Sequence, residues 1–168
     1  MPGNCSRSSR LRNARRFGVT AYKVPESVLV VVYTGALDVL LLERADHPGF
    51  WQSVTGSRTW PGEPLRATCA REVAEETGLL APAEAFDDWN LEHRYAIYAH
   101  WRHRYAPDVT HNTEHVFGLR VPRRFDPVLA PAEHTRYRWL PWRDAADACF
   151  SWTNAAAIRR LEALDAAR

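Results

Sequence analysis

Apolar residues first gather in two short runs in the N-terminal third of the chain. Ser27 to Thr34 and Asp38 to Glu43 are rich in Val and Leu, and Gly35 lies between them. Runs of this length and composition predict two β-strands, and the intervening glycine predicts a hairpin. Phe50 to Val54 predicts a third strand that leads into a loop at Gly56.

Further strands and a closing helix are predicted downstream. Arg94 to Tyr105 alternates between apolar and polar residues, which is typical of a strand with one face in the core. His115 to Val121 and Tyr137 to Leu140 predict two more strands, and Thr153 to Ala166 predicts the helix. Its apolar side carries Ala157, Ile158, Leu161 and Leu164.

The segment between Gly62 and Gly78 has the pattern of an amphipathic helix. Pro64 suits its start and Gly78 suits the position just past its end. An apolar residue recurs at every fourth position, at Leu65, Cys69 and Val73. Strands combined with two main helices predict an α/β sandwich.

Composition fits one soluble domain. The chain has 168 residues, of which 46% are hydrophobic and 25% charged, enough to form a core without a second domain. No apolar run reaches the length of a membrane span, so no membrane partner is expected. Cys5, Cys69 and Cys149 make an odd number without metal-ligand spacing, which favours reduced thiols and a cytoplasmic protein. The oligomeric state is not indicated.

The N-terminus differs from the rest in charge. Its first 16 residues contain five arginines and no acidic residue, without apolar periodicity. We expect residues 1–18 to form a basic, disordered tail and residues 19–168 to form the domain. A weak nucleic-acid contact is one interpretation of this tail. We favour a dispensable extension, so no nucleic-acid partner is expected.

Three carboxylates lie close together on the predicted helix. At about 100° per residue, Glu72, Glu75 and Glu76 share an arc of about 100°. Like charges so placed repel, and a hard divalent cation that accepts carboxylate oxygens would compensate. The alternative is a solvated acidic helix in which Arg71 pairs with Glu75, four residues further on.

The whole string around these carboxylates resembles the Nudix box, G-x5-E-x7-R-E-U-x-E-E-x-G-U, where U is aliphatic. The match is complete from Glu63 through Arg71, Glu72, Val73, Glu75, Glu76, Gly78 and Leu79. The departure lies upstream, where six residues rather than five separate Gly56 from Glu63. The resemblance implies a Nudix-type α/β/α sandwich with a mixed β-sheet, and the departure concerns the loop and not the acidic residues.

Segments outside the box resemble the bacterial dihydroneopterin triphosphate pyrophosphohydrolases, a narrower group of Nudix enzymes. The similarity runs from about Tyr22 to Ile158 and is carried by residues 50–57, 102–107, 112–114, 133–134, 137–140 and 151–152. It implies release of pyrophosphate from 7,8-dihydroneopterin 3′-triphosphate in folate biosynthesis, leaving the monophosphate. Hydrolysis of nucleoside triphosphates such as dATP is implied as a side activity.

The resemblance also implies a metal site. Glu72, Glu76 and Glu133 would bind Mg²⁺, for which Mn²⁺ is a substitute, because oxygen ligands favour these ions over zinc. Arg71 would orient the glutamates. Glu76, Glu75 and Glu133 all remain candidates for the base that deprotonates the attacking water, and we favour Glu76.

Substrate-binding positions follow from the resemblance as well. They are Lys23, Arg44, Thr55, Ser151 and the segment Tyr95, Ala96, Ile97 and Tyr98. Lys23, the one lysine of the chain, and Arg44, at the end of an apolar strand, suit phosphate, with a solvated charge as the alternative. On an alternating strand Tyr95 and Tyr98 would face opposite ways, so at most one would stack on the pterin. Ala96 would offer backbone contacts alone.

Arg102, His103 and Arg104 would attract the triphosphate electrostatically, with ordinary surface charge as the alternative for each.

Two other functions stay open. A Nudix hydrolase of other nucleoside polyphosphates, such as dinucleoside polyphosphates or oxidised dNTPs, would share the box. A non-catalytic Nudix-fold module that binds nucleotides or nucleic acid would usually have lost some of the glutamates, and all of them are present here.

Overall fold

The computed structural model describes residues 22–166, apart from the side chains of residues 164 and 165. The basic tail expected over residues 1–18 lies outside this part. The strands are β1 (Glu26–Thr34), β2 (Asp38–Arg44), β3 (Trp51–Gln52), β4 (Val54–Ser57), β5 (Phe86–Ala96), β6 (His111–Val121) and β7 (His134–Pro141). The helices are α1 (Leu65–Thr77), α2 (Trp142–Ala148), α3 (Trp152–Arg159) and α4 (Leu161–Ala166), with 3-10 helices η1 (Ala83–Ala85) and η2 (Ala99–Arg104).

The seven strands of the described chain form one mixed sheet built around β1. β1 pairs in parallel with β6, from Glu26 opposite Thr113 to Thr34 opposite Val121. It pairs antiparallel with β2 and β4. Antiparallel pairs also join β5 to β6 and join β3 and β7 to β2. The predicted hairpin of the first two strands and the mixed sheet are confirmed.

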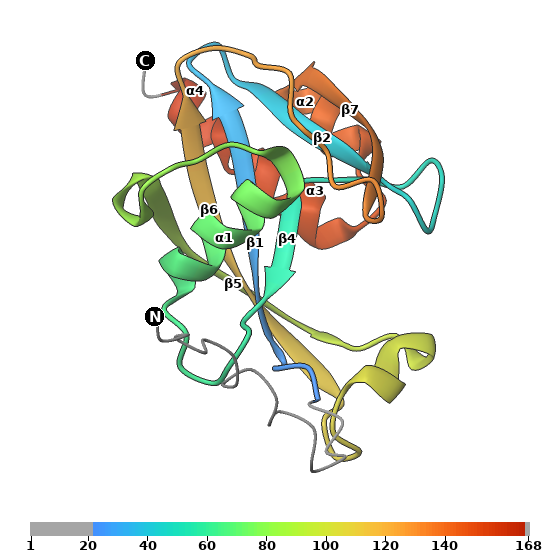
Figure 1. Ribbon diagram of the computed structural model, residues 1–168. Helices are drawn as coiled ribbons and strands as arrows, with labels where there is room; N and C mark the ends of the chain where they lie inside the picture. Colours follow the sequence, from blue (N-terminus) through green and yellow to red (C-terminus); the bar gives the residue numbers. More distant parts are fainter. Residues whose placement is uncertain (1–21, 167–168) are drawn as a thin grey trace, which may run out of the picture.

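Helices cover both faces of this sheet, which gives three layers (Figure 1). Alternate residues of β1 enter two separate cores. Val28, Val30 and Val32 pack toward α1, which contributes Cys69 and Val73. The other alternate set packs toward α2, α3 and α4 and consists of Leu29, Val31 and Tyr33. Because both faces are covered, β1 has a nearly unbroken apolar sequence, and the predicted α/β/α sandwich is confirmed.

Helix α1 ends as its sequence predicts. Gly78 adopts a left-handed backbone conformation with φ of 71°, and its N–H donates to the carbonyl of Ala74. Glycine takes this conformation at little cost, so it stops the helix without strain. Among the described helices, none has both the length and the hydropathy required to cross a membrane.

The strand predicted over Arg94 to Tyr105 is wrong in its second half. β5 covers Phe86–Ala96, and Ala99–Arg104 forms the 3-10 helix η2. The last ladder-like hydrogen bond runs from the Ile97 N–H to the Thr110 carbonyl. Beyond it, the N–H groups of Trp101 and Tyr105 donate to carbonyls three residues earlier instead of to a neighbouring strand. The alternation of residue types in this region therefore reflects no strand.

Other boundaries also differ from the sequence prediction, among them the starts of β5 at Phe86 and of β7 at His134. β6 begins at His111, four residues early, because β5 supplies it with a partner there. The third predicted strand divides at Ser53 into β3 and β4. The closing helix divides at Arg160 into α3 and α4, and α2 was not predicted.

A buried carboxylate on β2 holds two neighbouring segments in place. The side chain of Glu43 is 2% exposed and accepts hydrogen bonds from the Gly49 N–H, the Thr135 hydroxyl and the Arg136 guanidinium. The hydrogen bonds from Arg136 and Thr135 lower the pKa of Glu43 to about 2. Glu43 thus ties the 45–50 loop and the start of β7 to β2.

Replacing Glu43 should give a stability loss that depends on pH. A lowered pKa stabilises the fold above the ordinary value of 4.5, and the contribution disappears as pH falls through about 2. We expect Glu43→Gln to melt several degrees below wild type at neutral pH, with the gap closing between pH 4.5 and 2. Thermal melts across this range test it, with exposed Glu162→Gln as the control. A gap that stays constant down to pH 2 would contradict the assigned ion pair.

Candidate active site

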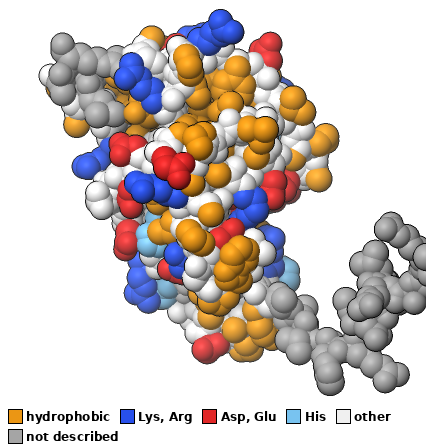
Figure 2. Space-filling model, turned by 60° about the vertical axis from the view of Figure 1, so that its left-hand side comes forward, with side chains coloured by type: hydrophobic (Ala, Val, Ile, Leu, Met, Phe, Trp, Pro, Cys, Tyr) orange, Lys and Arg blue, Asp and Glu red, His pale blue; other side chains and the backbone are white. Residues whose placement is uncertain are grey.

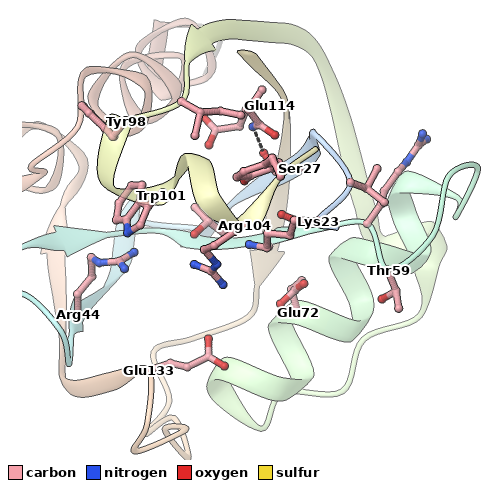
Figure 3. A pocket seen from close by; sticks show the side chains of 18 of the residues that line it. Lys23, Ser27, Arg44, Thr59, Glu72, Tyr98, Trp101, Arg104, Glu114 and Glu133 are labelled. Atoms are coloured by element: carbon pink, nitrogen blue, oxygen red, sulfur yellow. Dashed lines mark hydrogen bonds between the residues drawn. The ribbon is translucent and has the colours of Figure 1, made fainter. Parts of the chain in front are cut away.

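A large cavity opens where the start of β1, β4, α1, η2 and the loop before β7 meet. Its volume is about 720 Å³. A second lobe of about 300 Å³ shares six lining residues with it and reaches the start of α3. Figure 3 shows that the charge of the larger cavity's walls changes along its length. Glu72 and Glu133 lie at one end, Lys23 and Arg104 in the middle and Glu114 at the other end.

Acidic side chains from two distant segments meet at one end of the cavity, where Glu72 and Glu133 line it and Glu76 lies buried beside His134 without lining it. Glu72 and Glu76 come from adjacent turns of α1, and Glu133 and His134 come from the chain at the start of β7. Ligand atoms of Glu76, Glu133 and His134 all lie within 4.8 Å of one another. His134 Nε2 is 3.0 Å from Glu76 Oε2. We call Glu72, Glu76, Glu133 and His134 the acidic wall.

Burial makes a bare negative charge unfavourable on the two glutamates that α1 supplies to this wall. The residue Glu76 is 2% exposed and Glu72 is 8% exposed. Loss of solvent raises the pKa of Glu76, and it raises that of Glu72 to about 7 despite the neighbouring Arg71. Among the described residues, Glu76 Oε2 and both ring nitrogens of His134 have no aligned hydrogen-bond partner. Such an arrangement suits a divalent cation, which binds open carboxylate oxygens and offsets their charge.

The position of Glu72 depends on a missing side chain in β4. A Cβ atom at Gly56 would lie 1.8 Å from Glu72 Cδ. No side chain fits at that distance, so glycine lets the strand pass directly beneath the carboxylate. The first glycine of the Nudix box therefore packs against the box's first helical glutamate.

Hydrogen bonds hold the loop that carries one extra residue against side chains of the box. Arg71 donates to the Ser57 carbonyl at 2.9 Å, and the Thr59 N–H donates to the carboxylate of Glu63. Arg71 in turn lies 3.3 Å from Glu63. The additional residue is thus accommodated within residues 57–62, and the glutamates stay together.

Arg71 contacts the carboxylates without lining the cavity. Its guanidinium lies 2.7 Å from Glu72 and 3.3 Å from Glu75. The Arg71–Glu75 pair of the solvated-helix alternative therefore exists, but as one of several contacts. Glu75 differs from its neighbours on the helix, because its side chain is 55% exposed at the rim.

The predicted phosphate partners reach the cavity. Lys23 and Arg44 both line it, as does Thr55. Burial, followed by the nearby Arg104, lowers the pKa of Lys23. Arg44 forms two hydrogen bonds with Asp46, at 2.8 and 2.7 Å, and its guanidinium lies over the Trp101 ring.

The predicted pterin-binding segment lines the cavity in a different way from that expected. Tyr95 and Tyr98 both line both lobes, Ile97 lines the larger one and Ala96 the smaller one. The expectation that the two tyrosines face opposite ways is wrong because β5 ends at Ala96 and the chain turns. Ser151 lines the smaller lobe and caps α3 by accepting from the Asn154 N–H.

Several lining residues received no individual role from the sequence. They are Trp101, Asn112, Glu114 and Trp152. Arg104 also lines the cavity, unlike Arg102 and His103. The signal available for Asn112 and Glu114 was their spacing of two residues, which places both on one face once β6 is known to begin at His111.

Comparison with known proteins agrees with this geometry. A family model described as the NUDIX domain matches residues 23–161. The chain is 43% identical over 143 residues to the dihydroneopterin triphosphate diphosphatase of Escherichia coli strain K12, which covers 83% of this chain and 93% of that protein. It is 40% identical over 147 residues to the protein of the same name in Haemophilus influenzae, covering 86% and 91%.

A solved structure with the same sequence identity to this chain has a similar fold. The E. coli dihydroneopterin triphosphate pyrophosphohydrolase superposes with a TM-score of 0.74 at 43% identity, covering 83% of this chain and 95% of that chain. The family model spans most of the 168 residues and includes the whole acidic wall. The chain therefore belongs to the Nudix family.

Proposed function

We propose that this chain is a Mg²⁺-dependent pyrophosphohydrolase that converts 7,8-dihydroneopterin 3′-triphosphate to dihydroneopterin monophosphate and pyrophosphate, as a step in folate biosynthesis. Hydrolysis of dATP is a side activity. The observation that carries the proposal is the acidic wall, of which Glu72, Glu133 and His134 line one cavity together with basic side chains and an aromatic lobe. The E. coli and H. influenzae relatives, each aligned over more than 90% of its length, are named for dihydroneopterin triphosphate and support this choice of substrate.

The acidic wall would hold the metal. Glu72, Glu76 and Glu133 supply carboxylate oxygens for Mg²⁺, or for Mn²⁺ as a substitute, and His134 fixes the orientation of Glu76. When bound, the ion neutralises phosphate oxygens so that water is able to approach phosphorus. Arg71 holds Glu72 and Glu75 in place from behind the wall.

Proton transfer falls to a carboxylate of the wall. Glu76 is our choice for the base that takes the proton of the attacking water, because its side chain is 2% exposed and burial raises its pKa. Glu133 remains an alternative at the same end of the cavity. Glu75 is the weakest of the three, because Arg71 already occupies its carboxylate and water surrounds it.

The rest of the cavity would hold the remainder of the substrate. Lys23, Arg44 and Arg104 place positive charge between the acidic wall and the smaller lobe, where phosphates would lie. Thr55 and Ser151 offer hydroxyl groups. Tyr98 and Trp152 line the smaller lobe, are each more than half exposed and offer aromatic faces suited to a flat ring.

The face shown in Figure 2 gives no support to a nucleic-acid-binding function. On the face shown in Figure 2, basic and acidic side chains of the described residues are mixed rather than gathered in a basic stripe. The non-catalytic alternative is disfavoured by the intact acidic wall. A cytoplasmic location is consistent with Cys69 and Cys149, which are free thiols.

A product assay tests the proposed reaction. With Mg²⁺ and dihydroneopterin triphosphate, the expected products are pyrophosphate and the monophosphate in equal amounts. Stepwise orthophosphate release, or faster turnover of a diadenosine polyphosphate than of the pterin and dATP, would contradict the proposal and favour another Nudix substrate class.

Glu76→Gln should remove most activity while leaving the fold intact. Loss of both a metal ligand and the base should lower kcat by at least about a hundredfold, since general-base catalysis alone contributes roughly 10²–10⁴. Steady-state kinetics with circular dichroism measures both properties. Glu84→Gln, in η1 and away from the cavity, is the control. A wild-type rate for Glu76→Gln in Mg²⁺ would refute the assigned role.

Gly56→Ala should damage the site without adding or removing a charge. The new methyl group would occupy the space of the Glu72 carboxylate, which must then leave its position. We expect a rise in the Mg²⁺ concentration needed for half-maximal rate and a loss of kcat of about tenfold or more. Gly35→Ala is the matched control, because its Cβ would meet mainly the mobile end of Arg120. Equal Mg²⁺ dependence in the two variants would count against the packing role of Gly56.

A further inference from the structure

The end of the cavity opposite the acidic wall carries an unusual set of polar residues on the sheet. They lie on the sheet face that forms the core beneath α2 and α3 further along the strands, where Leu29 and Val116 are buried. At this end the same face instead presents Ser27, His93, Tyr95, Asn112 and Glu114, which we call the polar patch.

Strand register brings the members of the patch together. His93 lies directly opposite Glu114, and Tyr95 lies opposite Asn112, in the antiparallel pair of β5 and β6. Ser27 lies beside Glu114 in the parallel pair of β1 and β6. Cross-strand neighbours on one face have Cβ atoms about 5 Å apart, so the patch is a continuous surface.

Glu114 is buried, and one of its two carboxylate oxygens lacks a hydrogen bond within the described chain. It is 4% exposed, and its Oε2 has no hydrogen-bond partner among the described residues. His93 Nδ1 is 3.7 Å away, longer than a hydrogen bond, and also has no partner. A buried charge left in this state is unfavourable, so the patch is suited to donors that a ligand brings.

The other polar groups of the patch are held by one another. The Asn112 amide donates to the Ser27 hydroxyl at 2.7 Å and to the Tyr95 hydroxyl at 3.1 Å. Asn112 Oδ1 is left without a partner in the described chain. Glu114 and Asn112 therefore both offer acceptor oxygens, and Glu114 lines both lobes of the cavity.

The surroundings of Glu114 fit a flat heterocycle. His93 contacts the Trp152 ring edge-on, with centroids 5.0 Å apart, and Trp152 lines the smaller lobe. Lys23 and Arg104 lie between Glu114 and the acidic wall (Figure 3). A ligand with phosphates at the acidic wall would thus place its ring at the polar patch.

We propose that Glu114 determines specificity by accepting two hydrogen bonds from the 2-amino-4-oxo-pyrimidine edge of the pterin ring. This inference rests on the proposed function and adds the group that recognises the base. The edge presents the N3–H and the 2-amino group side by side, and two parallel donors match the two oxygens of a carboxylate. Adenine instead presents one amino group next to the acceptor N1, so Glu114 makes one hydrogen bond to it.

The variant Glu114→Gln should change selectivity more than chemistry. Glutamine places a donor where an acceptor is required, so kcat/KM for dihydroneopterin triphosphate should fall roughly 10- to 100-fold, mainly through KM. The value for dATP should fall by less than about threefold. The ratio of the two kcat/KM values therefore drops at least about threefold.

The control separates recognition from structural support. Glu92→Gln removes a carboxylate from the neighbouring position of β5, where the side chain is 63% exposed and pairs with His115. Its selectivity ratio should equal that of wild type. If Glu114→Gln lowers kcat/KM equally for both substrates, or leaves the ratio of the two values unchanged, Glu114 only supports the fold and the proposal fails.

A binding experiment on the wild-type protein requires neither a variant nor turnover. Calorimetric titration should show 6,7-dimethylpterin binding at least about tenfold more tightly than 6,7-dimethyllumazine, in which an oxygen acceptor replaces the 2-amino donor. Equal affinities would overturn the proposal. Because neither ligand carries a phosphate, this result is independent of whether the triphosphate is hydrolysed as proposed.

Discussion

Two carboxylates buried on adjacent turns of one helix are the constraint on which the site depends. Water cannot solvate Glu72 and Glu76 in their positions, so charge on them has to be offset by something else. Arg71 meets part of this need for Glu72 but does not reach Glu76 in any described contact. A divalent cation would offset the remainder, and the same ion would offset the charge of a triphosphate.

Other features of the fold serve to bring these groups together. Gly56 removes the side chain that would displace Glu72, and Gly78 ends α1 just past the last glutamate of the box. Glu43 fixes the start of β7 to β2, next to Glu133 and His134. Contacts in three separate segments thus hold the buried like charges close together. A site held in this way is pre-organised before its ligands bind.

Local patterns in the sequence predicted the local parts of this structure. The caps and stripe of α1, the hairpin around Gly35 and the order of the first strands follow from residue spacing and from glycine and proline chemistry. The prediction of a single strand over Arg94 to Tyr105 failed because alternation alone does not reveal where the partner strand ends. Past Ile97 the chain has no ladder partner and turns into η2.

Contacts between distant segments had no local signal. The approach of Glu133 to α1 was expected from family resemblance alone, since 56 residues of chain between it and Glu76 carry no pattern that fixes their separation in space. His134 and Glu114 received no role for the same reason. Their burial without full hydrogen bonding, visible only in the fold, is what distinguishes them from ordinary polar residues.

The most direct test is the location of a bound ion. Anomalous diffraction from crystals soaked in Mn²⁺ should show a peak within coordinating distance of the carboxylates of Glu76 and Glu133, with Glu72 on the same side. A peak elsewhere, or no peak at saturating Mn²⁺ with the glutamates still clustered, would contradict the account, because the buried charge would then be stable without a cation.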